Sequence, residues 1–277
     1  MTIASGMLDA GLSFLLMFLL FRPLEWAFPA KANQRCLRPQ WWTDFCFMAG
    51  QNLFFNGAVL WFLAQTEHWA DAIRPAEMRL WISGLSWWTQ AILVVVIGDF
   101  LVYWGHRLQH RVPFRWRFHS IHHSAEHMDW LAAHREHPLD SLYVVLLVNL
   151  PAFAIGFPIK TLALFVGFRA LWSIYLHANV RIPHGPLRLL IGAPELHHWH
   201  HDRARDAGNY SNVSPLMDVI FGTYHRPDNE PAAFGVEEPI PTDYLGQLLH
   251  PFRRPRAAAE SDQRAVTAQP TIVSVNT

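Results

Sequence analysis

The histidines are concentrated in one part of this 277-residue chain, since 15 of the 17 lie between residues 106 and 225. Nine of them lie in three short motifs, HRLQH, HSIHH and HHWHH, and all but His198 have helical spacing: His106 and His110, then His119, His122 and His123, then His197, His200 and His201. Residues spaced three or four apart share one face of a helix, so each motif presents two or three imidazoles together. Imidazole commonly binds iron, zinc and copper, and eight such ligands exceed what one ion accepts. The spacing therefore predicts a site for two metal ions.

Composition excludes several other kinds of chemistry. Lys plus Arg equals Asp plus Glu at 22 each, so the chain lacks the basic excess of a nucleic-acid-binding protein. The two cysteines, Cys36 and Cys46, form no CxxC pair, which removes thiolate zinc sites and thioredoxin-type redox chemistry. The sequence also contains no GxGxxG, GxSxG or HExxH motif.

Five apolar segments are expected to carry the histidine motifs, at residues 6–21, 45–64, 80–103, 142–159 and 161–176. The first resembles a retained membrane anchor, and the second and third have about the 20 residues that a spanning helix needs. Because Pro151, Pro158 and Lys160 interrupt the last two, a helical hairpin that either crosses the membrane twice or only dips into it is predicted there. A buried core helix of a soluble protein is the alternative for each segment.

Basic residues indicate the orientation of this bundle. They follow the first and third apolar segments, at Lys31, Arg35 and Arg38 and at Arg107, Arg111, Arg115 and Arg117. The positive-inside rule then places the histidine region in the cytoplasm and the N-terminus outside. We therefore predict an all-α, multi-span membrane bundle with a cytosolic helical cap that carries the two-metal site. Residues 1–250 are expected to form this domain and residues 251–277 a disordered tail, which has few large apolar residues.

Residues 99–140 and 176–227 resemble the sterol desaturase and fatty acid hydroxylase superfamily of integral-membrane di-iron enzymes. The resemblance rests on a D-x6-H-x3-H opening, the WRFHxxHHS box, HPLD, HAN, the HxxHH box and D-x2-FGT, which place the histidine-box core at about residues 99–227. It implies two iron ions, dioxygen as oxidant and a lipid substrate. It adds His177 to the eight box histidines as a ninth metal ligand. A tenth position of some members is Ser173 here, so His184, His137 or water remains open for it.

Residues outside the boxes are candidates for orienting the metal-binding imidazoles through their second ring nitrogen. They are Asp99, His137, Asn179, His184, Asn209 and Asp218, with capping or helix packing as the alternative role. His198 is expected to point away from the face that His197 and His201 share. Ether-lipid monooxygenases of the superfamily carry a Glu where this chain has Arg111, which argues against that branch.

The predicted function is that of an oxidoreductase which uses iron and dioxygen to hydroxylate, or desaturate, a lipid C–H bond. Hydroxylation is preferred by analogy with the superfamily alone. Two electrons per turnover must come from a separate ferredoxin, cytochrome or reductase, for which the arginines at positions 107, 111, 115 and 117 are a candidate docking face, although they suit lipid headgroups equally. The alternative is a membrane heme- or metal-binding protein for transport or electron transfer, which would carry histidines inside its apolar segments. The first three segments contain none.

Overall fold

The structure is a computed structural model that describes residues 3–157, 159–204 and 208–253. These residues form helices and loops and contain no β-strand, only two isolated bridges. The elements in chain order are α1 (Ile3–Ala27), α2 (Trp41–Gly50), η1 (Gln51–Phe55), α3 (Asn56–Ile73), α4 (Ala76–Gly84), α5 (Trp87–Arg111), α6 (Pro113–His123), η2 (Ala132–His134), α7 (Pro138–Ile155), α8 (Ile159–His177), η3 (Gly185–Leu189), α9 (Pro194–His200), α10 (Leu216–Ile220), α11 (Tyr244–Leu249) and η4 (His250–Phe252).

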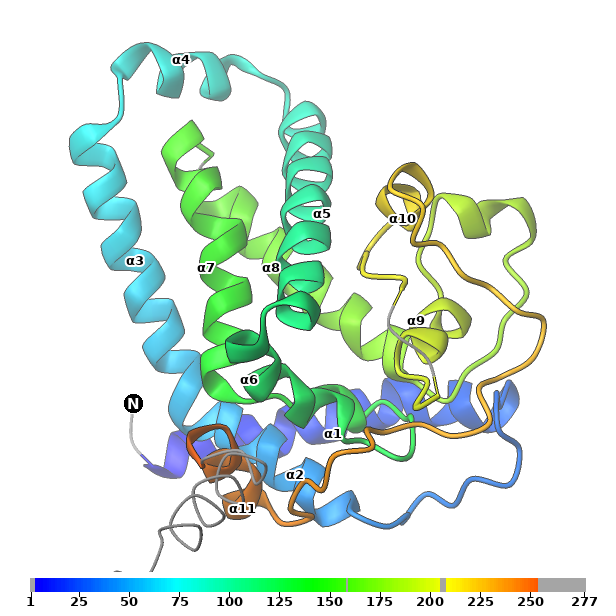
Figure 1. Ribbon diagram of the computed structural model, residues 1–277. Coiled ribbons are helices and arrows are strands. Elements are labelled where there is room, and N and C mark those ends of the chain that lie inside the picture. Colours follow the sequence, from blue (N-terminus) through cyan, green and yellow to red (C-terminus); the bar gives the residue numbers. More distant parts are fainter. Residues whose placement is uncertain (1–2, 158, 205–207, 254–277) are drawn as a thin grey trace, which may run out of the picture.

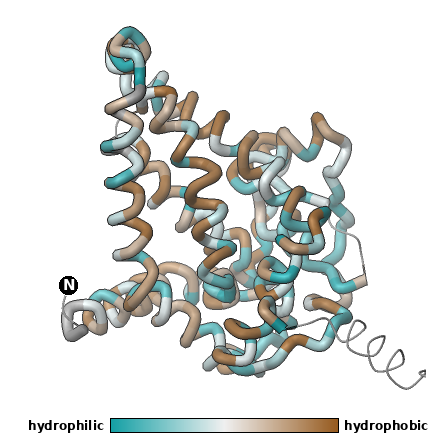
Figure 2. Tube along the Cα trace, turned by 60° about the vertical axis from the view of Figure 1, so that its left-hand side comes forward, coloured by the Kyte–Doolittle hydropathy of each residue, from teal (hydrophilic) through white to brown (hydrophobic). Residues whose placement is uncertain are grey.

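A bundle of long helices forms the apolar part of the molecule. Helices α3, α5 and α7 run side by side, and α8 descends diagonally behind them toward α9 (Figure 1). Four helical stretches are long and apolar enough to cross a membrane: Gly6–Ala27, Trp41–Ala70, Trp87–Arg111 and Pro138–Ile155. Hydrophobic residues dominate the upright helices, whereas polar residues gather around the loops beside α9 (Figure 2). The predicted all-α membrane bundle is confirmed.

Local signals set the ends of these helices and correct two predicted boundaries. The segment 80–103 is not one helix, because α4 ends at Gly84 and the Ser86 hydroxyl accepts the Thr89 amide at 3.2 Å as the N-cap of α5. The next predicted segment, 142–159, ends early. Gly156 adopts a left-handed conformation with φ 113° after α7, which stops the helix at Ile155. The chain then turns into α8, so the predicted helical hairpin is present.

The second apolar segment is continuous with a π-helical turn at η1. Its polar residues contact protein, as the sequence predicts: Gln51 Nε2 donates to the His134 carbonyl at 3.2 Å, and Asn52 Nδ2 donates to the Met48 carbonyl at 2.9 Å. A π turn inserts an extra residue into a helix and often marks a functional site. Here it turns Gln51 toward η2, which follows the histidine box of α6.

Helix α1 departs from the expected arrangement. It lies across one end of α3, α5 and α7 instead of running parallel to them (Figures 1 and 2). Met7, Leu8, Leu12, Leu16 and Leu19 are exposed on it, so α1 remains an apolar surface for lipid. The start of α1 lies at the same end of the bundle as the histidine-bearing α6 (Figure 1). The sequence had instead placed the N-terminus on the opposite side from the histidines.

A buried ion-pair network joins the loop after α1 to the segment that follows the α6 histidines. Arg38 contacts the carboxylates of Asp44 and Asp129, each at 2.6 Å, and Arg135 contacts Asp44 at 2.5 Å. All four side chains are buried. Charges removed from water are stable only while each keeps its partner. Asp44 is the link between the two arginines.

Removing that link is expected to destabilise the fold. Asp44→Ala leaves Arg38 and Arg135 buried with a missing partner, so we expect a loss of about 3–5 kcal/mol in the free energy of unfolding. Thermal unfolding of the purified chain in detergent measures the effect. Glu77→Ala, at an exposed position on α4, is the matched control and should leave the unfolding midpoint unchanged. Equal midpoints for the two variants would contradict this role of Asp44.

The predicted tail lies mostly outside the described residues. Of residues 251–277, only 251–253 are described. Pro251 and Phe252 belong to η4, where Pro251 is buried and the Phe252 ring lies 5.6 Å from the ring of Phe118. The folded part therefore extends at least to Arg253, whose carbonyl accepts Arg117 Nη2 at 2.7 Å.

Candidate metal centre

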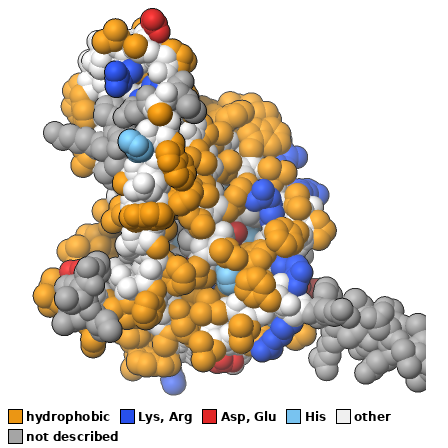
Figure 3. Space-filling view, turned by 90° about the vertical axis from the view of Figure 1, so that its left-hand side faces the viewer, with side chains coloured by type: hydrophobic (Ala, Val, Ile, Leu, Met, Phe, Trp, Pro, Cys, Tyr) orange, Lys and Arg blue, Asp and Glu red, His pale blue; other side chains and the backbone are white. Residues whose placement is uncertain are grey.

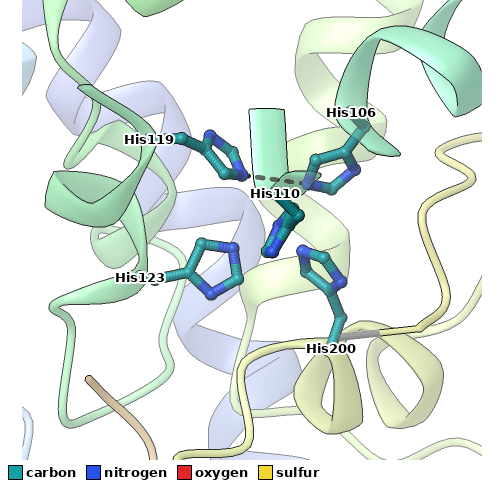
Figure 4. A group of neighbouring side chains, drawn as sticks. All are labelled: His106, His110, His119, His123 and His200. Carbon is teal, nitrogen blue, oxygen red and sulfur yellow. Dashed lines mark hydrogen bonds between the residues drawn. The ribbon is translucent and has the colours of Figure 1, made fainter. Parts of the chain in front are cut away.

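Five of the predicted ligands converge as one group, in which one ring nitrogen from each histidine lies within 4.8 Å of those of the others. Its members are His106, His110, His119, His123 and His200. The i, i+4 spacing on α5 and again on α6 points two imidazoles from each helix into the same space, and α9 supplies the fifth (Figure 4). Gly105 lets α5 approach α7 beside this group, because a Cβ there would lie 2.1 Å from Leu147 Cδ2.

The other four predicted ligands form a second group within the same 4.8 Å limit: His122, His177, His197 and His201. They come from α6, from the end of α8 and from α9 with its C-cap. The two groups adjoin, since the rings of His123 and His201 stack with centroids 4.3 Å apart. The structure thus brings together all nine histidines and divides the second and third boxes between the groups.

Backbone carbonyls fix the tautomers of several of these rings. A carbonyl oxygen only accepts, so the ring nitrogen that contacts it must carry the proton. His122 Nδ1 donates to the Arg135 carbonyl at 3.1 Å, and His177 Nδ1 donates to the Ser173 carbonyl at 2.7 Å. His106 and His200 donate in the same way to the carbonyls of Tyr210 and Gly208, at 2.9 and 2.6 Å. In neutral rings the Nε2 atoms are then left as lone-pair donors for a metal.

Those lone pairs face one another without a proton between them. His122 Nε2 and His177 Nε2 are 3.0 Å apart, and both rings hold their proton on Nδ1. Burial is the largest cause that lowers the pKa values of His122, His123 and His201 well below the usual range, so these rings are neutral. Two ligands at about 2.1 Å from one metal and at right angles to each other are about 3.0 Å apart. The donor set therefore fits a bound cation.

Further nitrogens at the centre are buried and lack a hydrogen-bond partner within the described residues. They are the Nε2 atoms of His110, His123 and His200 and the Nδ1 atoms of His197 and His201. Buried polar atoms normally have partners, and each orphan is costly. A cation in the first group would satisfy the three orphaned Nε2 atoms, which all belong to it.

A carboxylate that the sequence analysis did not select supports the first group. Asp140 Oδ2 accepts His119 Nδ1 at 2.7 Å, and its other oxygen accepts Gln109 Nε2 at 2.6 Å. Hydrogen bonds of this kind orient a ligating imidazole and raise its basicity. Asp140 is the acid of the HPLD motif, and Gln109 lies between the two histidines of the first box, so both were visible in the sequence.

Three of the six residues predicted to orient the imidazoles act through the backbone instead. Asp218 accepts the amides of Tyr210 and Ser211 at 2.8 and 2.9 Å, which holds the loop whose Tyr210 carbonyl binds His106. Asp99 accepts the amides of residues 213 and 214 in the same loop. Asn209, with φ 54°, donates to the Leu196 carbonyl of α9 at 2.8 Å. They shape the loop whose Tyr210 and Gly208 carbonyls accept from His106 and His200.

The other three lie apart from both groups. Asn179 bonds to the backbone of Lys31, His137 to that of Leu248, and His184 to the Tyr175 hydroxyl. Neither His137 nor His184 belongs to the nine-histidine cluster, which leaves the tenth ligand open. His198 points away as predicted, with Nδ1 2.6 Å from Glu230 and Nε2 bonded to the Ala178 carbonyl.

One side of the centre opens on a polar cavity of about 460 Å³. His110, His123 and His200 line it together with Trp116, whose ring lies 5.1 Å from that of His110 and 5.4 Å from that of His123. Asp202, Arg203, Glu237 and Glu238 complete the wall. The first group is thus reachable from a polar surface, while the second is fully buried.

A helical membrane bundle in which nine imidazoles converge is the arrangement expected of a histidine-box protein, and comparison with known proteins gives the family that it resembles. Residues 91–223 match the model of the fatty acid hydroxylase family. This match confirms the predicted resemblance to the sterol desaturase and fatty acid hydroxylase superfamily. No solved structure matches the chain.

The curated relatives are lipid enzymes of this superfamily. Ornithine lipid hydroxylase OlsE of Rhizobium tropici is 32% identical over 168 residues, which are 60% of this chain and 51% of that protein. Alkylglycerol monooxygenase of Homo sapiens is 33% identical over 58% of this chain and 35% of that protein. Very-long-chain aldehyde decarbonylase GL1-8 of Oryza sativa subsp. indica is 30% identical over 50% of this chain and 54% of that protein. The chain spans between a third and a little over half the length of these relatives.

Proposed function

We propose that this protein is a membrane-bound, non-heme di-iron oxygenase that hydroxylates a lipid C–H bond. The reaction takes one dioxygen, two external electrons and two protons, and it yields one C–OH group and one water. The nine histidines would hold the irons, with five ligands for one ion and four for the other. Iron bound there would supply the binding and reduction of dioxygen, which imidazole alone cannot perform.

The paired lone pairs of His122 and His177 are the observation that carries this proposal. Their Nδ1 protons are held outward by carbonyls, so the cluster is already arranged for a metal. All-nitrogen ligation with open positions suits non-heme iron. The alternative of a heme protein is not favoured, because heme takes one or two axial histidines, whereas nine imidazoles converge here.

The relatives' names support a lipid substrate and favour hydroxylation over desaturation. Two of them are named a hydroxylase of ornithine lipid and a monooxygenase of alkylglycerol. Arg111, where ether-lipid monooxygenases carry Glu, favours a substrate other than an ether lipid. We place the whole activity in one domain, residues 1–250, because α1 and α2 both pack against η1, and α2 also packs against η2 and α11.

We further propose that the electrons arrive from a ferredoxin, cytochrome or reductase at the arginine-rich ends of α5 and α6. Arg107 lies over the Trp104 ring and Arg115 over the Tyr143 ring, at 5.4 and 3.9 Å. Arg115 and Arg117 are the sequence neighbours of Trp116, which lines the polar cavity beside the first histidine group. An acidic face on a soluble donor would complement them.

The histidine site is proposed to face the cytoplasm. Lys31, Arg35 and Arg38 follow α1, and the arginines at 107, 111, 115 and 117 flank the histidines, which the positive-inside rule favours on that side. With α1 lying along the membrane surface, the N-terminus would share that side. Labelling of the exposed Cys36 by a membrane-impermeant thiol reagent in sealed membranes would show on which side of the membrane the loop after α1 lies.

Lipid analysis of cells that express the protein tests the proposed reaction. We expect a product one oxygen heavier than its precursor in cells grown with iron, and its loss with His200→Ala. Mass spectrometry of extracted lipids measures both. His68→Ala, an exposed histidine on α3, is the control and should keep the product. Identical lipid profiles for the wild type and His200→Ala would contradict the function, and a product lighter by two hydrogens would assign desaturation instead.

A further inference from the structure

A cavity of about 430 Å³ lies between α1, η1, η2, α7 and α8. One part of its wall is apolar and includes Met17, Val145, Val148 and Ile174. Another part is polar and includes Gln51, His134, Glu136, Arg169 and Asn212. In the middle of the face shown in Figure 3, a histidine and an acidic side chain are visible among hydrophobic side chains. Such a mixed wall suits a lipid that carries a polar group.

The cavity shares its walls with the second histidine group. Ser173 lines it, and the Ser173 carbonyl accepts the Nδ1 proton of His177. His134 and Glu136 flank Arg135, whose carbonyl accepts the Nδ1 proton of His122. A molecule in the cavity therefore lies one residue layer from the candidate metal ligands. None of the nine histidines lines it, so the polar wall has a role separate from metal binding.

His134 offers this cavity an unused hydrogen-bond acceptor. Its Nδ1 lies 3.1 Å from Gln51 Oε1, and Gln51 Nε2 donates to the His134 carbonyl, so Gln51 must accept the Nδ1 proton. Burial is the main cause that lowers the pKa of His134 to about 4, which keeps the ring neutral. Its Nε2 is then a buried lone pair with no partner in the described structure. A ligand N–H or O–H would satisfy it.

Arg169 offers the opposite, an unused donor. Its Nη1 is buried without a hydrogen-bond partner in the part of the chain that is described, and its guanidinium lies 5.6 Å from the centre of the Phe165 ring. Asp99 is close enough to interact with it electrostatically but is held by the amides of residues 213 and 214. Asn212 Oδ1 is a second buried acceptor without a partner in the same wall.

Glu136 does not supply the missing negative charge. Burial, and then the neighbouring Asp140, raise the pKa of this carboxyl to about 8, so it is mostly protonated at neutral pH. It is engaged with the Ser141 hydroxyl, which donates to it at 2.7 Å. The polar wall thus presents a neutral acceptor at His134 and a cationic donor at Arg169.

We propose that this cavity selects the lipid substrate by its head group, which donates an N–H or O–H to His134 Nε2 and accepts from Arg169 Nη1. The inference rests on the proposed lipid oxygenase function. It assigns specificity to lipids whose head combines a donor with a carboxylate or carbonyl acceptor. Esters and hydrocarbons that lack the donor would bind less well, because His134 would stay buried and unpaired.

Competition binding tests this selection without turnover. The probe is radiolabelled N-oleoylglycine, which carries an N–H and a carboxylate, bound to the iron-loaded full chain in nanodiscs without reductant. The competitors are monoolein, with hydroxyl donors and an uncharged ester, and methyl oleate, with no donor. We expect the wild type to bind N-oleoylglycine about tenfold or more tightly than methyl oleate. Because monoolein carries a donor but no anionic acceptor, its affinity shows how much of the preference depends on the donor alone.

Two variants locate the effect. His134→Leu should remove most of the preference for both donor lipids, and Arg169→Met should weaken N-oleoylglycine about tenfold, while methyl oleate changes little in each. His68→Leu and Arg79→Met, at exposed positions, are the matched controls. The ratio between two lipids within one variant, at unchanged iron content, is independent of folding yield.

Equal binding of all three lipids by the wild type would overturn the inference, and so would an equal loss for all three in His134→Leu. Because no oxidation occurs in this assay, its outcome is separate from that of the proposed reaction. Retained head-group selectivity in a chain that oxidises no lipid would contradict the oxygenase function alone.

Discussion

His197→Ala is expected to lose about one of two bound irons and all lipid oxidation. His197 belongs to the four-histidine group, where its Nε2 lies 3.0 Å from that of His177 and 3.1 Å from that of His201. Three remaining imidazoles bind iron more weakly, whereas the five-histidine group is untouched. Because dioxygen reduction is proposed to need both ions, half the metal should give no product. Iron content and lipid oxidation measured on the same preparation check both statements.

The neighbouring residue provides a matched control. His198→Ala removes an imidazole from the same helix, but that ring contacts Glu230 and the Ala178 carbonyl and neither histidine group. It should keep two irons and activity. His110→Ala should mirror His197→Ala by emptying the other group. Loss of both irons in His197→Ala, with full retention in His198→Ala, would show one shared site in place of two.

Asp140→Asn is expected to lower iron affinity at the five-histidine group by about 10- to 100-fold, the usual effect of removing a partner of a ligating histidine. The carboxylate accepts His119 Nδ1 at 2.7 Å and Gln109 at 2.6 Å. An amide of the same shape accepts through one oxygen only, so one of these contacts is lost. Titration of the metal-free variant with ferrous iron measures the affinity.

The control for this carboxylate is Asp228→Asn, because the Asp228 side chain is fully exposed and pairs with Arg226 instead of a histidine. Its iron affinity should equal that of the wild type. An Asp140→Asn variant that binds iron as tightly as the wild type would show that Asp140 only packs beside His119. The second group should bind iron with the wild-type affinity in both variants, so its part of the titration serves as an internal reference.

The convergence of the histidines was predictable because helical periodicity is strong. The i, i+4 pairs His106/His110 and His119/His123 follow directly from 3.6 residues per turn, and His177 followed from the superfamily resemblance. The all-α bundle was predictable from its long apolar segments. Ser86 and Gly156, which end or begin helices, are also ordinary local signals that corrected boundaries by a few residues.

The partition of the nine histidines into two groups was not predictable, because it depends on how α6, α8 and α9 cross. His122 and His123 are adjacent in sequence yet belong to different groups. The hydrogen-bond partners of the Nδ1 protons could not be predicted either. Arg135, Ser173 and Gly208 act through backbone carbonyls, and a backbone carbonyl carries no sequence signature. The orientation of α1 is likewise set by packing at the bundle's end and not by its composition.

Anaerobic titration of the metal-free chain with ferrous iron tests the central claim most directly. Counting the iron that stays bound after dialysis should give two ions per chain, because the histidines form two groups of five and four. A stoichiometry of one, or no retained iron, would contradict the two-metal centre on which the proposed chemistry depends.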